Sequence, residues 1–261
     1  MATALITGAS SGIGESFSYA LARQNYDLVL VARRQDRLNT VADKAKKLGA
    51  KRAEVIASDI SRPGAPLELQ ANLARLPIEI DCLINNAGFG TTGRFDQLRL
   101  ERELEEIQLN VNALVALTRL FLPAMIERHN GAIINVASTA AFQPIPYMAT
   151  YAATKAFVLN FTEAIAVETR DTGVRILALC PGPVRTEFQA VAKNQRARVP
   201  SFAYLDANTV VSQALAAVAR GRRVRINGMM NAAGAFAARV FPRSLVTAVA
   251  GRIYRNAGID G

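Results

Sequence analysis

Short apolar runs alternate with longer amphipathic stretches along most of this chain. The runs are rich in Val, Ile and Leu and lack strict polar alternation, which is typical of strands covered on both faces. They predict a sheet of about seven strands, over Thr3–Thr7, Leu28–Ala32, Ala53–Ala57, Cys82–Asn85, Ala132–Ala137, Arg175–Cys180 and Arg223–Ile226.

Between these runs, apolar residues recur at helical spacing. The pattern predicts helices over Gly12–Gln24, Gln35–Leu48, Pro66–Leu76, Leu100–Arg128, Tyr151–Thr172 and Ala207–Arg220. Regular exchange of strand and helix requires right-handed crossovers between parallel strands. We therefore expect a single α/β domain of the Rossmann type, a doubly wound parallel sheet with helices on both faces.

Two regions interrupt the alternation. Residues 183–208 form a long mixed connection containing Phe188, Phe202 and Tyr204, and such connections are usually functional or mobile. We expect a substrate lid there, within a catalytic domain over 1–227. Residues 228–261 would be a helical C-terminal extension, which packs on the body or on a partner subunit, or else lies on anionic lipid as a basic amphipathic helix. The packed arrangement is preferred.

Composition limits the classes of site. The chain is 51% hydrophobic, which suffices for a sizeable core. Cys82 and Cys180 each lie in an apolar run, which predicts buried, reduced thiols rather than a disulfide. With these two cysteines and one histidine, we expect no metal site. The chain shows no secretory signal pattern and no uninterrupted run of about 20 apolar residues, so a cytoplasmic location is expected.

The formal net charge of +10 admits nucleic acid, anionic lipid, acidic proteins or phosphorylated ligands as partners. The basic residues are spread out, with no long basic block and no nucleic-acid-binding motif. A solvated basic surface together with one phosphate site is the simpler interpretation, and no nucleic-acid partner is expected.

A glycine-rich loop, Thr7–Gly14, directly follows the first strand and opens the first helix. Glycines in such a loop allow a tight turn and a close approach to a pyrophosphate, and the helix N-terminus offers free N–H groups. The spacing is Gly-x-x-x-Gly-x-Gly with no following Gly-Lys-Ser/Thr, so the loop is not a triphosphate P-loop.

The second strand ends in Ala32-Arg33-Arg34, with no acidic residue at its tip. In dinucleotide-binding folds an acid here binds the ribose 2′-hydroxyl, whereas arginine pairs with a 2′-phosphate. NADP(H) is therefore favoured over NAD(H). The alternative is that both arginines are simply solvated at the strand end.

Tyr151 and Lys155 are four residues apart on a predicted helix, so they share one face. An isolated tyrosine has a pKa of roughly 10, and a neighbouring ammonium favours the phenolate and lowers that pKa. Such a pair could run acid/base chemistry on an alcohol or a carbonyl without metal or histidine. A lone pair of this kind is more often solvated helix surface, so its neighbours decide.

Six ordered signals resemble the short-chain dehydrogenase/reductase family, in its NADP-preferring form. They are Thr-Gly-x-x-x-Gly-x-Gly at 7–14, Asn85-Asn-Ala-Gly88, Asn110, Ser138, Tyr151-x-x-x-Lys155 and Pro181-Gly182. The resemblance covers about residues 3–227. It implies that Tyr151 is the general acid/base and that Lys155 lowers its pKa and hydrogen-bonds the nicotinamide ribose. It also implies that Ser138 orients the substrate oxygen and that Asn110 helps hold a water between Lys155 and solvent.

For the cofactor, the resemblance places Asp59 and Ile60 at the adenine and Thr186 near the nicotinamide carboxamide. The expected cofactor-binding set is Gly8, Ser10, Ser11, Gly12, Ile13, Gly14, Arg33, Arg34, Asp59, Ile60, Asn86, Ala87, Gly88, Tyr151, Lys155, Pro181, Gly182, Val184 and Thr186. In the family, the helices predicted at Leu100–Arg128 and Tyr151–Thr172 commonly build a homodimer or homotetramer. Taken singly, Ser138 could merely cap a strand end and Asn85-Asn86 could be a plain turn.

The resulting hypothesis is NADP(H)-dependent interconversion of a carbonyl compound and an alcohol. The apolar side chains of residues 139–150 favour an apolar or amphipathic substrate. Basic residues in the lid leave open a 3-oxoacyl thioester, delivered by an acyl carrier protein. A non-catalytic NADP(H)-binding regulator is the alternative from another class.

Overall fold

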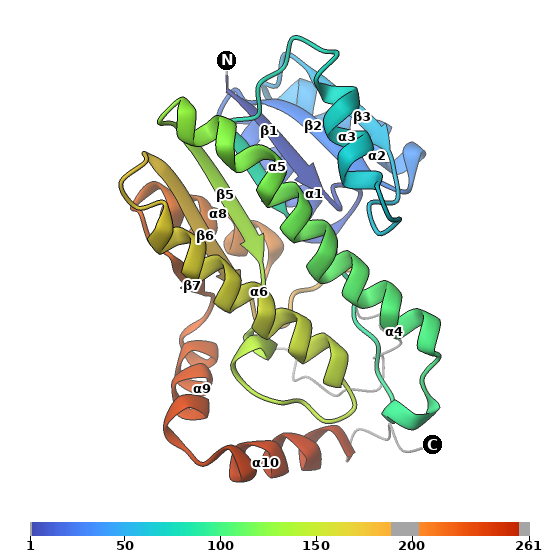
Figure 1. The fold of residues 1–261 in the computed structure, drawn as a ribbon, viewed down its shortest axis with the longest axis vertical. Helices are drawn as coiled ribbons and strands as arrows, with labels where there is room; N and C mark the ends of the chain where they lie inside the picture. Colours follow the sequence, from blue (N-terminus) through green and yellow to red (C-terminus); the bar gives the residue numbers. More distant parts are fainter. Residues whose placement is uncertain (1, 189–203, 256–261) are drawn as a thin grey trace.

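The computed structural model describes residues 2–188 and 204–255. Its centre is a parallel sheet of seven strands in the order β3-β2-β1-β4-β5-β6-β7 (Figure 1). The strands are β1 (Thr3–Thr7), β2 (Asp27–Ala32), β3 (Ala53–Ala57), β4 (Cys82–Asn85), β5 (Gly131–Val136), β6 (Val174–Cys180) and β7 (Val224–Ile226). This confirms the expected doubly wound sheet. The strand order reverses between β1 and β4, which is where open α/β sheets place ligands.

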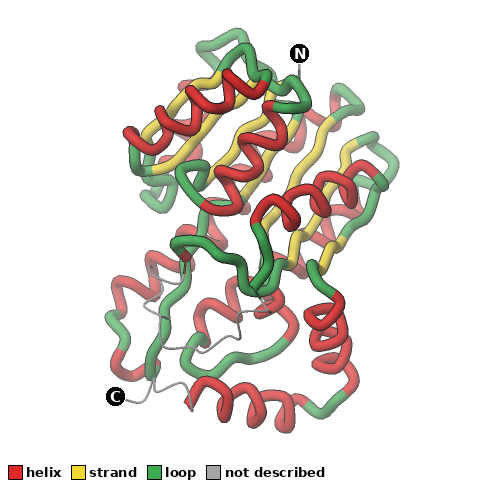
Figure 2. The backbone as a smooth tube through the Cα atoms, turned by 180° about the vertical axis from the view of Figure 1, so that it is seen from behind, coloured by secondary structure: helices red, strands yellow, loops and turns green. Residues whose placement is uncertain are grey.

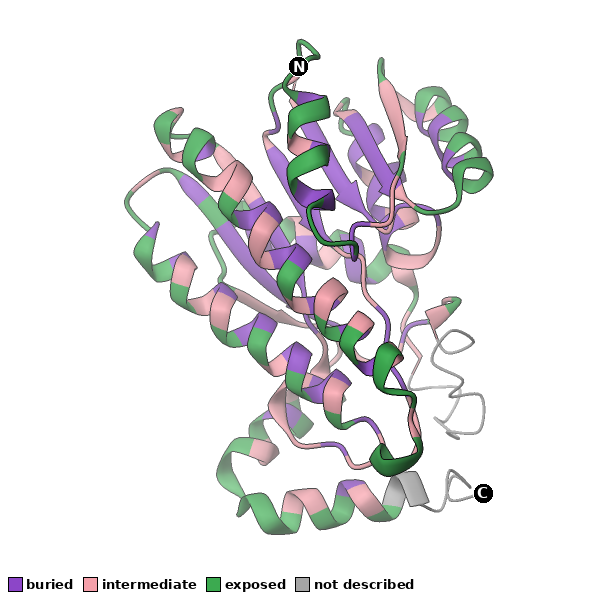
Figure 3. Cartoon of the chain, turned by 45° about the vertical axis from the view of Figure 1, so that its right-hand side comes forward, coloured by how far each residue is buried: buried purple, intermediate pink, exposed green. Residues whose placement is uncertain are grey.

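The middle strands are buried because helices cover both faces of the sheet (Figures 2 and 3). All of β1 is buried, and Leu5 pairs with Val29 on one side and with Leu83 on the other. One face packs against α1 (Gly12–Ala22), α2 (Gln35–Leu48) and α8 (Ala207–Ala219). The other packs against α3 (Ala65–Leu73), α5 (Leu114–Glu127) and α6 (Ala149–Glu168). On each face of the sheet, the core consists of apolar strand side chains packed against the apolar side of the covering helices.

The helix predicted over Leu100–Arg128 is continuous but not uniform. It consists of α4 (Leu100–Ile107), a π-helical turn η2 (Gln108–Ala113) and α5, which contains Pro123. By length and composition alone, this segment of the described chain could cross a membrane, a test that core helices of soluble proteins also pass. Leu117 and Met125 lie in the core against the sheet, which accounts for part of its apolar character, since 33% of the apolar window is buried.

The C-terminal region forms two further helices, α9 (Met229–Val240) and α10 (Arg243–Arg255), below the sheet in Figure 1. The helix α9 packs against the short 3₁₀ helix η3 (Thr139–Phe142), and another 3₁₀ helix, η1 (Phe95–Gln97), precedes α4. Most of the expected lid, including Phe202, lies outside the described residues. Its two described ends meet in a bridge between Val184 and Leu205.

Candidate active site

The predicted site residues converge on a cavity of about 630 Å³ at the carboxyl ends of the strands. Loops after six strands, β1 to β6, contribute to its wall. From the expected sets, the lining residues are Gly8, Ser10, Ser11, Gly12, Ile13, Arg33, Arg34, Asp59, Ile60, Asn86, Ala87, Gly88, Ser138, Tyr151, Lys155, Pro181, Gly182, Val184 and Thr186. Gly14 and Asn110 do not line it and lie behind its wall.

The loop after β1 has a backbone that requires glycine. Gly8 and Gly12 have φ angles of +65° and +60°, in the left-handed region that side chains disfavour. A Cβ on Gly14 would lie 2.3 Å from the carbonyl oxygen of Gly8, so this position allows the helix to pack closely on the turn. These features leave the N-terminus of α1 open toward the cavity, where it can receive a pyrophosphate.

Polar side chains tie the loops after β1 and β4 together. The backbone N–H groups of Asn86 and Ala87 both donate to the Thr7 Oγ1 at 3.0 Å. The Asn86 amide returns a bond to the Thr7 carbonyl at 2.9 Å. Asn86 is therefore more than a residue of a plain turn, since it holds two walls of the cavity in register.

The end of β2 carries the basic corner of the cavity. Arg34 donates from Nη2 to the hydroxyls of Ser10 (3.2 Å) and Ser11 (3.1 Å) and to Glu187 (2.8 Å). These donors and hydroxyls together suit a phosphate, because a guanidinium and neutral hydroxyls can all bond its oxygens. The fit with a 2′-phosphorylated dinucleotide rests on this arrangement and on the glycine loop.

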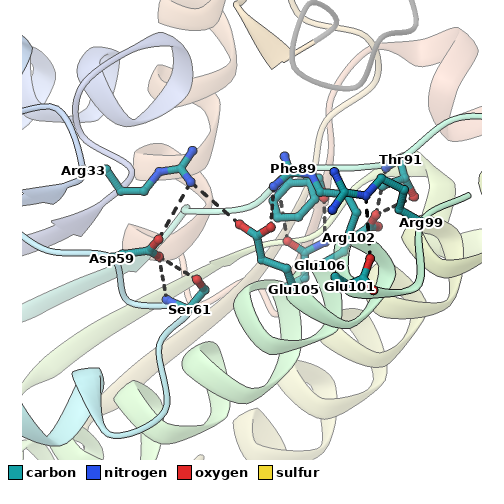
Figure 4. Close-up of polar contacts among 11 residues, drawn as sticks. Arg33, Asp59, Ser61, Phe89, Thr91, Arg99, Glu101, Arg102, Glu105 and Glu106 are labelled. Carbon is teal, nitrogen blue, oxygen red and sulfur yellow. Dashed lines mark hydrogen bonds and ion pairs between the residues drawn. The ribbon is translucent and has the colours of Figure 1, made fainter.

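Arg33 lies beside the same corner, between two carboxylates (Figure 4). Its Nη1 is 3.8 Å from Asp59 Oδ2 and 3.8 Å from Glu105 Oε1. Asp59 also accepts from the N–H and hydroxyl of Ser61. Arg33 is well exposed, so these ion pairs can be exchanged at little free-energy cost.

Tyr151 and Lys155 lie in the first turns of α6, and both are buried. Lys155 is 5% exposed, donates from Nζ to the Val136 carbonyl at 2.8 Å, and lies 5.8 Å from the centre of the Tyr151 ring. Burial lowers the pKa of Lys155 to about 8, and the charge of Glu106 acts in the opposite direction. The pair is thus not solvated helix surface, and it opens into the cavity.

Ser138 reaches the same cavity from the end of β5. It caps η3, with its Oγ accepting from the Ala140 N–H at 3.1 Å. The capping role that sequence alone allowed is therefore present. The hydroxyl hydrogen stays available for a substrate oxygen, because the cap uses Oγ as an acceptor.

Asn110 lies in the π-helical turn η2 and is almost fully buried. Its amide donates to the Phe89 carbonyl (2.8 Å) and to the Thr154 hydroxyl (3.1 Å), and its Oδ1 accepts from the Phe89 N–H (3.2 Å). Asn110 and the Lys155 ammonium both lie beside Gly88, since a Cβ placed there would be 2.8 Å and 3.4 Å from them. Its side chain holds the strand-end loop, and its expected role with water stays a prediction.

Sequence reasoning missed two parts of the site. The first is the helix α9, which lines the cavity with Met230, Asn231, Gly234 and Ala235, and Asn231 of this helix packs directly on Gly182. This contact is tertiary, and the Ala-rich tail carries no motif for it. Glu106 is the second, a fully buried carboxylate that accepts from the N–H and hydroxyl of Thr91, both at 2.8 Å. Among the described residues, no group of His, Cys, Asp and Glu could hold a metal ion.

Comparisons with known proteins show what this chain is similar to. The family model for short chain dehydrogenases matches residues 2–197. A short chain dehydrogenase of Pseudocercospora fijiensis is 38% identical over 192 residues, covering 72% of this chain and 61% of that protein, so this chain spans less than two thirds of that relative. The very-long-chain 3-oxoacyl-CoA reductase of Mus musculus is 31% identical over 231 residues, covering 86% of this chain and 70% of that protein.

Among solved structures, a short-chain dehydrogenase from Sphingobium yanoikuyae in complex with NADPH superimposes on this chain with a TM-score of 0.83. The two are 34% identical, and the match covers 89% of this chain and 90% of that one.

Proposed function

This chain belongs to the short-chain dehydrogenase/reductase family of oxidoreductases, and on that premise we propose that it interconverts a carbonyl compound and an alcohol with NADP(H). The observation that carries the proposal is the convergence of Ser138, Tyr151 and Lys155 with the glycine loop on one cavity. That cavity lies where the strand order of the sheet reverses.

Bound NADP(H) supplies or accepts the hydride. The residues of this chain position the substrate and move the proton. Ser138 donates to the substrate oxygen, Tyr151 gives that oxygen a proton in the reductive direction, and Lys155 favours the phenolate left behind. Both Tyr151 and Lys155 are buried, so their mutual electrostatics are only weakly screened by water.

Selection of NADP(H) over NAD(H) is part of the proposal. Its support is the basic corner made by Arg33 and Arg34 with the hydroxyls of Ser10 and Ser11. The Sphingobium structure in complex with NADPH is consistent with it. A 2′-phosphate would replace the carboxylate partners that both arginines have here.

The substrate half of the cavity favours an apolar or amphipathic compound. Its lining includes Phe142, Ile145, Met148, Phe188 and Tyr204. A 3-oxoacyl thioester is the second candidate, favoured by the similarity to the mouse very-long-chain 3-oxoacyl-CoA reductase. Such a substrate would thread its acyl chain along the same apolar wall.

A turnover screen tests the proposal. NADPH oxidation would be followed with simple ketones, steroid and retinoid carbonyls and 3-oxoacyl thioesters, in wild type and in Tyr151→Phe. Turnover in the wild type, reduced about 10²–10⁴-fold in the variant while NADPH binding persists, is the expected result. Near-normal turnover in Tyr151→Phe would show that Tyr151 is not the general acid. Tight NADPH binding with no turnover across the panel would favour the regulator instead.

The assembly and location are proposed with the function. We expect a homodimer or homotetramer in the cytoplasm.

The C-terminal extension, residues 228–261, is expected to pack on the body or on a partner subunit. Arg239 lies 5.4 Å over the ring of Phe142, which supports packing on the body. Met229 and Phe236 are 90% and 70% exposed, which leaves an apolar face for another subunit. If the full chain co-sedimented with anionic vesicles, the alternative that the C-terminal extension lies on anionic lipid would be favoured instead.

A further inference from the structure

Two buried carboxylates lie behind the Tyr151–Lys155 pair, on the inner face of α4. Glu106 is 0% exposed and Glu103 is 5% exposed. Each has one oxygen bonded to a threonine, Glu106 to Thr91 and Glu103 to Thr150. Within the described chain, the second oxygen of each is buried without a hydrogen-bond partner. Buried carboxylates left half-satisfied are costly and call for an explanation.

The loop between β4 and η1 connects Glu106 to the catalytic pair. Glu106 holds Thr91 of this loop, and Asn110, one turn later on the same continuous helix, holds Phe89. Between them lies Gly90, where a Cβ would be 2.8 Å from the Tyr151 ring. The loop thus runs from Thr91 at the Glu106 carboxylate, past the Tyr151 ring at Gly90, to Gly88 beside the Lys155 ammonium.

Within the described residues, two charged groups act on Glu106, namely Lys155 on α6 and Glu103 on α4. Burial raises the pKa of Glu106 to about 7, while Lys155 and the bonds from Thr91 oppose that rise. The charge of Glu106 and the thiol of Cys180 act in turn on the pKa of Lys155. Burial raises the pKa of Cys180 to about 12, so the thiol stays neutral. Among the described residues, Glu106 is therefore the carboxylate whose charge acts on this buried ammonium.

We propose that Glu106 is the buried counter-charge of Lys155, a positioning residue that keeps the lysine cationic and through it sets the pH at which Tyr151 ionises. A buried ammonium without a nearby anion gives up its proton readily, and a neutral lysine no longer favours the phenolate. The inference rests on the proposed function, because it assigns Glu106 to the proton-transfer centre of that same site.

Glu106→Gln separates charge from packing. The glutamine carbonyl can still accept both bonds from Thr91, so the loop keeps its anchor while the negative charge is lost. Glu101→Gln is the matched control, since Glu101 is on the same helix but exposed and paired with Arg99 at the surface. A cooperative thermal unfolding transition in both variants would show that they fold.

The first measurement needs no substrate. The ultraviolet absorbance of the Tyr151 phenolate is followed against pH in wild type, Glu106→Gln and Glu101→Gln, each minus the same protein with Tyr151→Phe. Without the Glu106 charge, Lys155 should lose its proton at lower pH, and a neutral Lys155 no longer favours the phenolate. The Tyr151 midpoint should therefore move to higher pH by about one unit in Glu106→Gln. No movement, or an equal movement in Glu101→Gln, would overturn the proposal.

The second measurement is the pH profile of alcohol oxidation with NADP⁺, on the alcohol that corresponds to whichever carbonyl the screen identifies. The limb that requires phenolate should shift to higher pH by the same amount in Glu106→Gln. A purely structural role predicts a lower rate with an unshifted limb, which would also overturn the proposal. If the wild type reduces nothing, the proposed function fails, yet the tyrosine titration still decides the role of Glu106.

Discussion

For Arg33 and Arg34, the residue type predicted the chemistry of the site, but it did not predict which residues the arginines contact. Both arginines lie at the end of β2 as a phosphate site requires, yet each is engaged with a carboxylate. Arg34 bonds Glu187, which is distant in sequence and follows β6. No local pattern could have indicated that contact.

The first prediction concerns cofactor choice. Arg34→Ala removes the donor shared by Ser10 and Ser11 and should weaken NADPH binding about tenfold, because charge-assisted hydrogen bonds at an exposed site contribute modestly. NADH binding should change little, since it has no 2′-phosphate. Nicotinamide fluorescence titration measures both, with Arg62→Ala, in a surface ion pair with Glu68, as the control. Equal weakening for the two dinucleotides would contradict 2′-phosphate recognition.

The second prediction is a pH dependence of stability. The pKa of Glu106 is raised from 4.5 to about 7 in the folded protein. Its contribution to stability is therefore fully present below about pH 4.5 and is lost as the pH rises through 7. Glutamine does not titrate, so Glu106→Gln does not lose this stability. Between about pH 4.5 and above pH 7, its unfolding free energy should therefore rise relative to that of the wild type by up to roughly 3 kcal/mol. Urea unfolding at about pH 5 and about pH 8 measures this gain, and an equal gap at both would contradict it.

The residues of the proposed site differ in how visible they are in the sequence. Tyr151 and Lys155 stand at a recognisable spacing, and Ser138 follows an apolar strand. Glu106 lies in Leu100–Ile107, a stretch with four glutamates of similar local context. Only the packing of α4 against the body shows that Glu103 and Glu106 face inward while Glu101 and Glu105 face outward.

At the scale of elements, the strands were predictable because a strand buried on both faces must be apolar throughout. The sequence runs match β1, β3 and β4 residue for residue. The π turn at η2 was not predictable, since its apolar spacing suits an ordinary α-helix equally well. It places Asn110 against the loop after β4, and such turns are frequent at functional sites.

The third prediction concerns α9 as a wall of the substrate cavity. Gly234 lines the cavity, and a Cβ placed there would meet no protein atom within 4 Å. Gly234→Leu should therefore fold normally, gain about 1 kcal/mol of helix propensity, and narrow the cavity. We expect KM for bulky ketones to rise about tenfold while small ketones are unaffected, as a lost apolar fit of this size implies.

Steady-state kinetics on a graded ketone series would measure this effect. Ala233→Leu is the control, because Ala233 is exposed on the same helix and does not line the cavity. Identical selectivity in the two variants would show that α9 does not limit the substrate.

At the scale of the whole molecule, many of the apolar side chains left exposed lie on two pairs of helices. One group lies on the outer faces of α4 and α6, which contact each other, and includes Leu104, Phe157 and Val167. Phe157 also stacks on Phe161, with ring centres 5.8 Å apart. A second group covers α9 and α10. Exposed apolar side chains that gather on neighbouring elements are typical of interaction surfaces.

The last prediction assigns the first of these patches to self-association. Phe157 is 41% exposed, so Phe157→Glu leaves the core intact and places a charge in the proposed subunit interface, where an unpaired charge costs several kcal/mol. Light scattering with size-exclusion chromatography should show the wild-type dimer or tetramer falling to a smaller species. Leu67→Glu, at another exposed apolar residue on α3, should leave the assembly unchanged. An unaltered assembly in Phe157→Glu would contradict this assignment. The exposed apolar side chains of α9 and α10, including Met229 and Phe236, would then be the next surface to test.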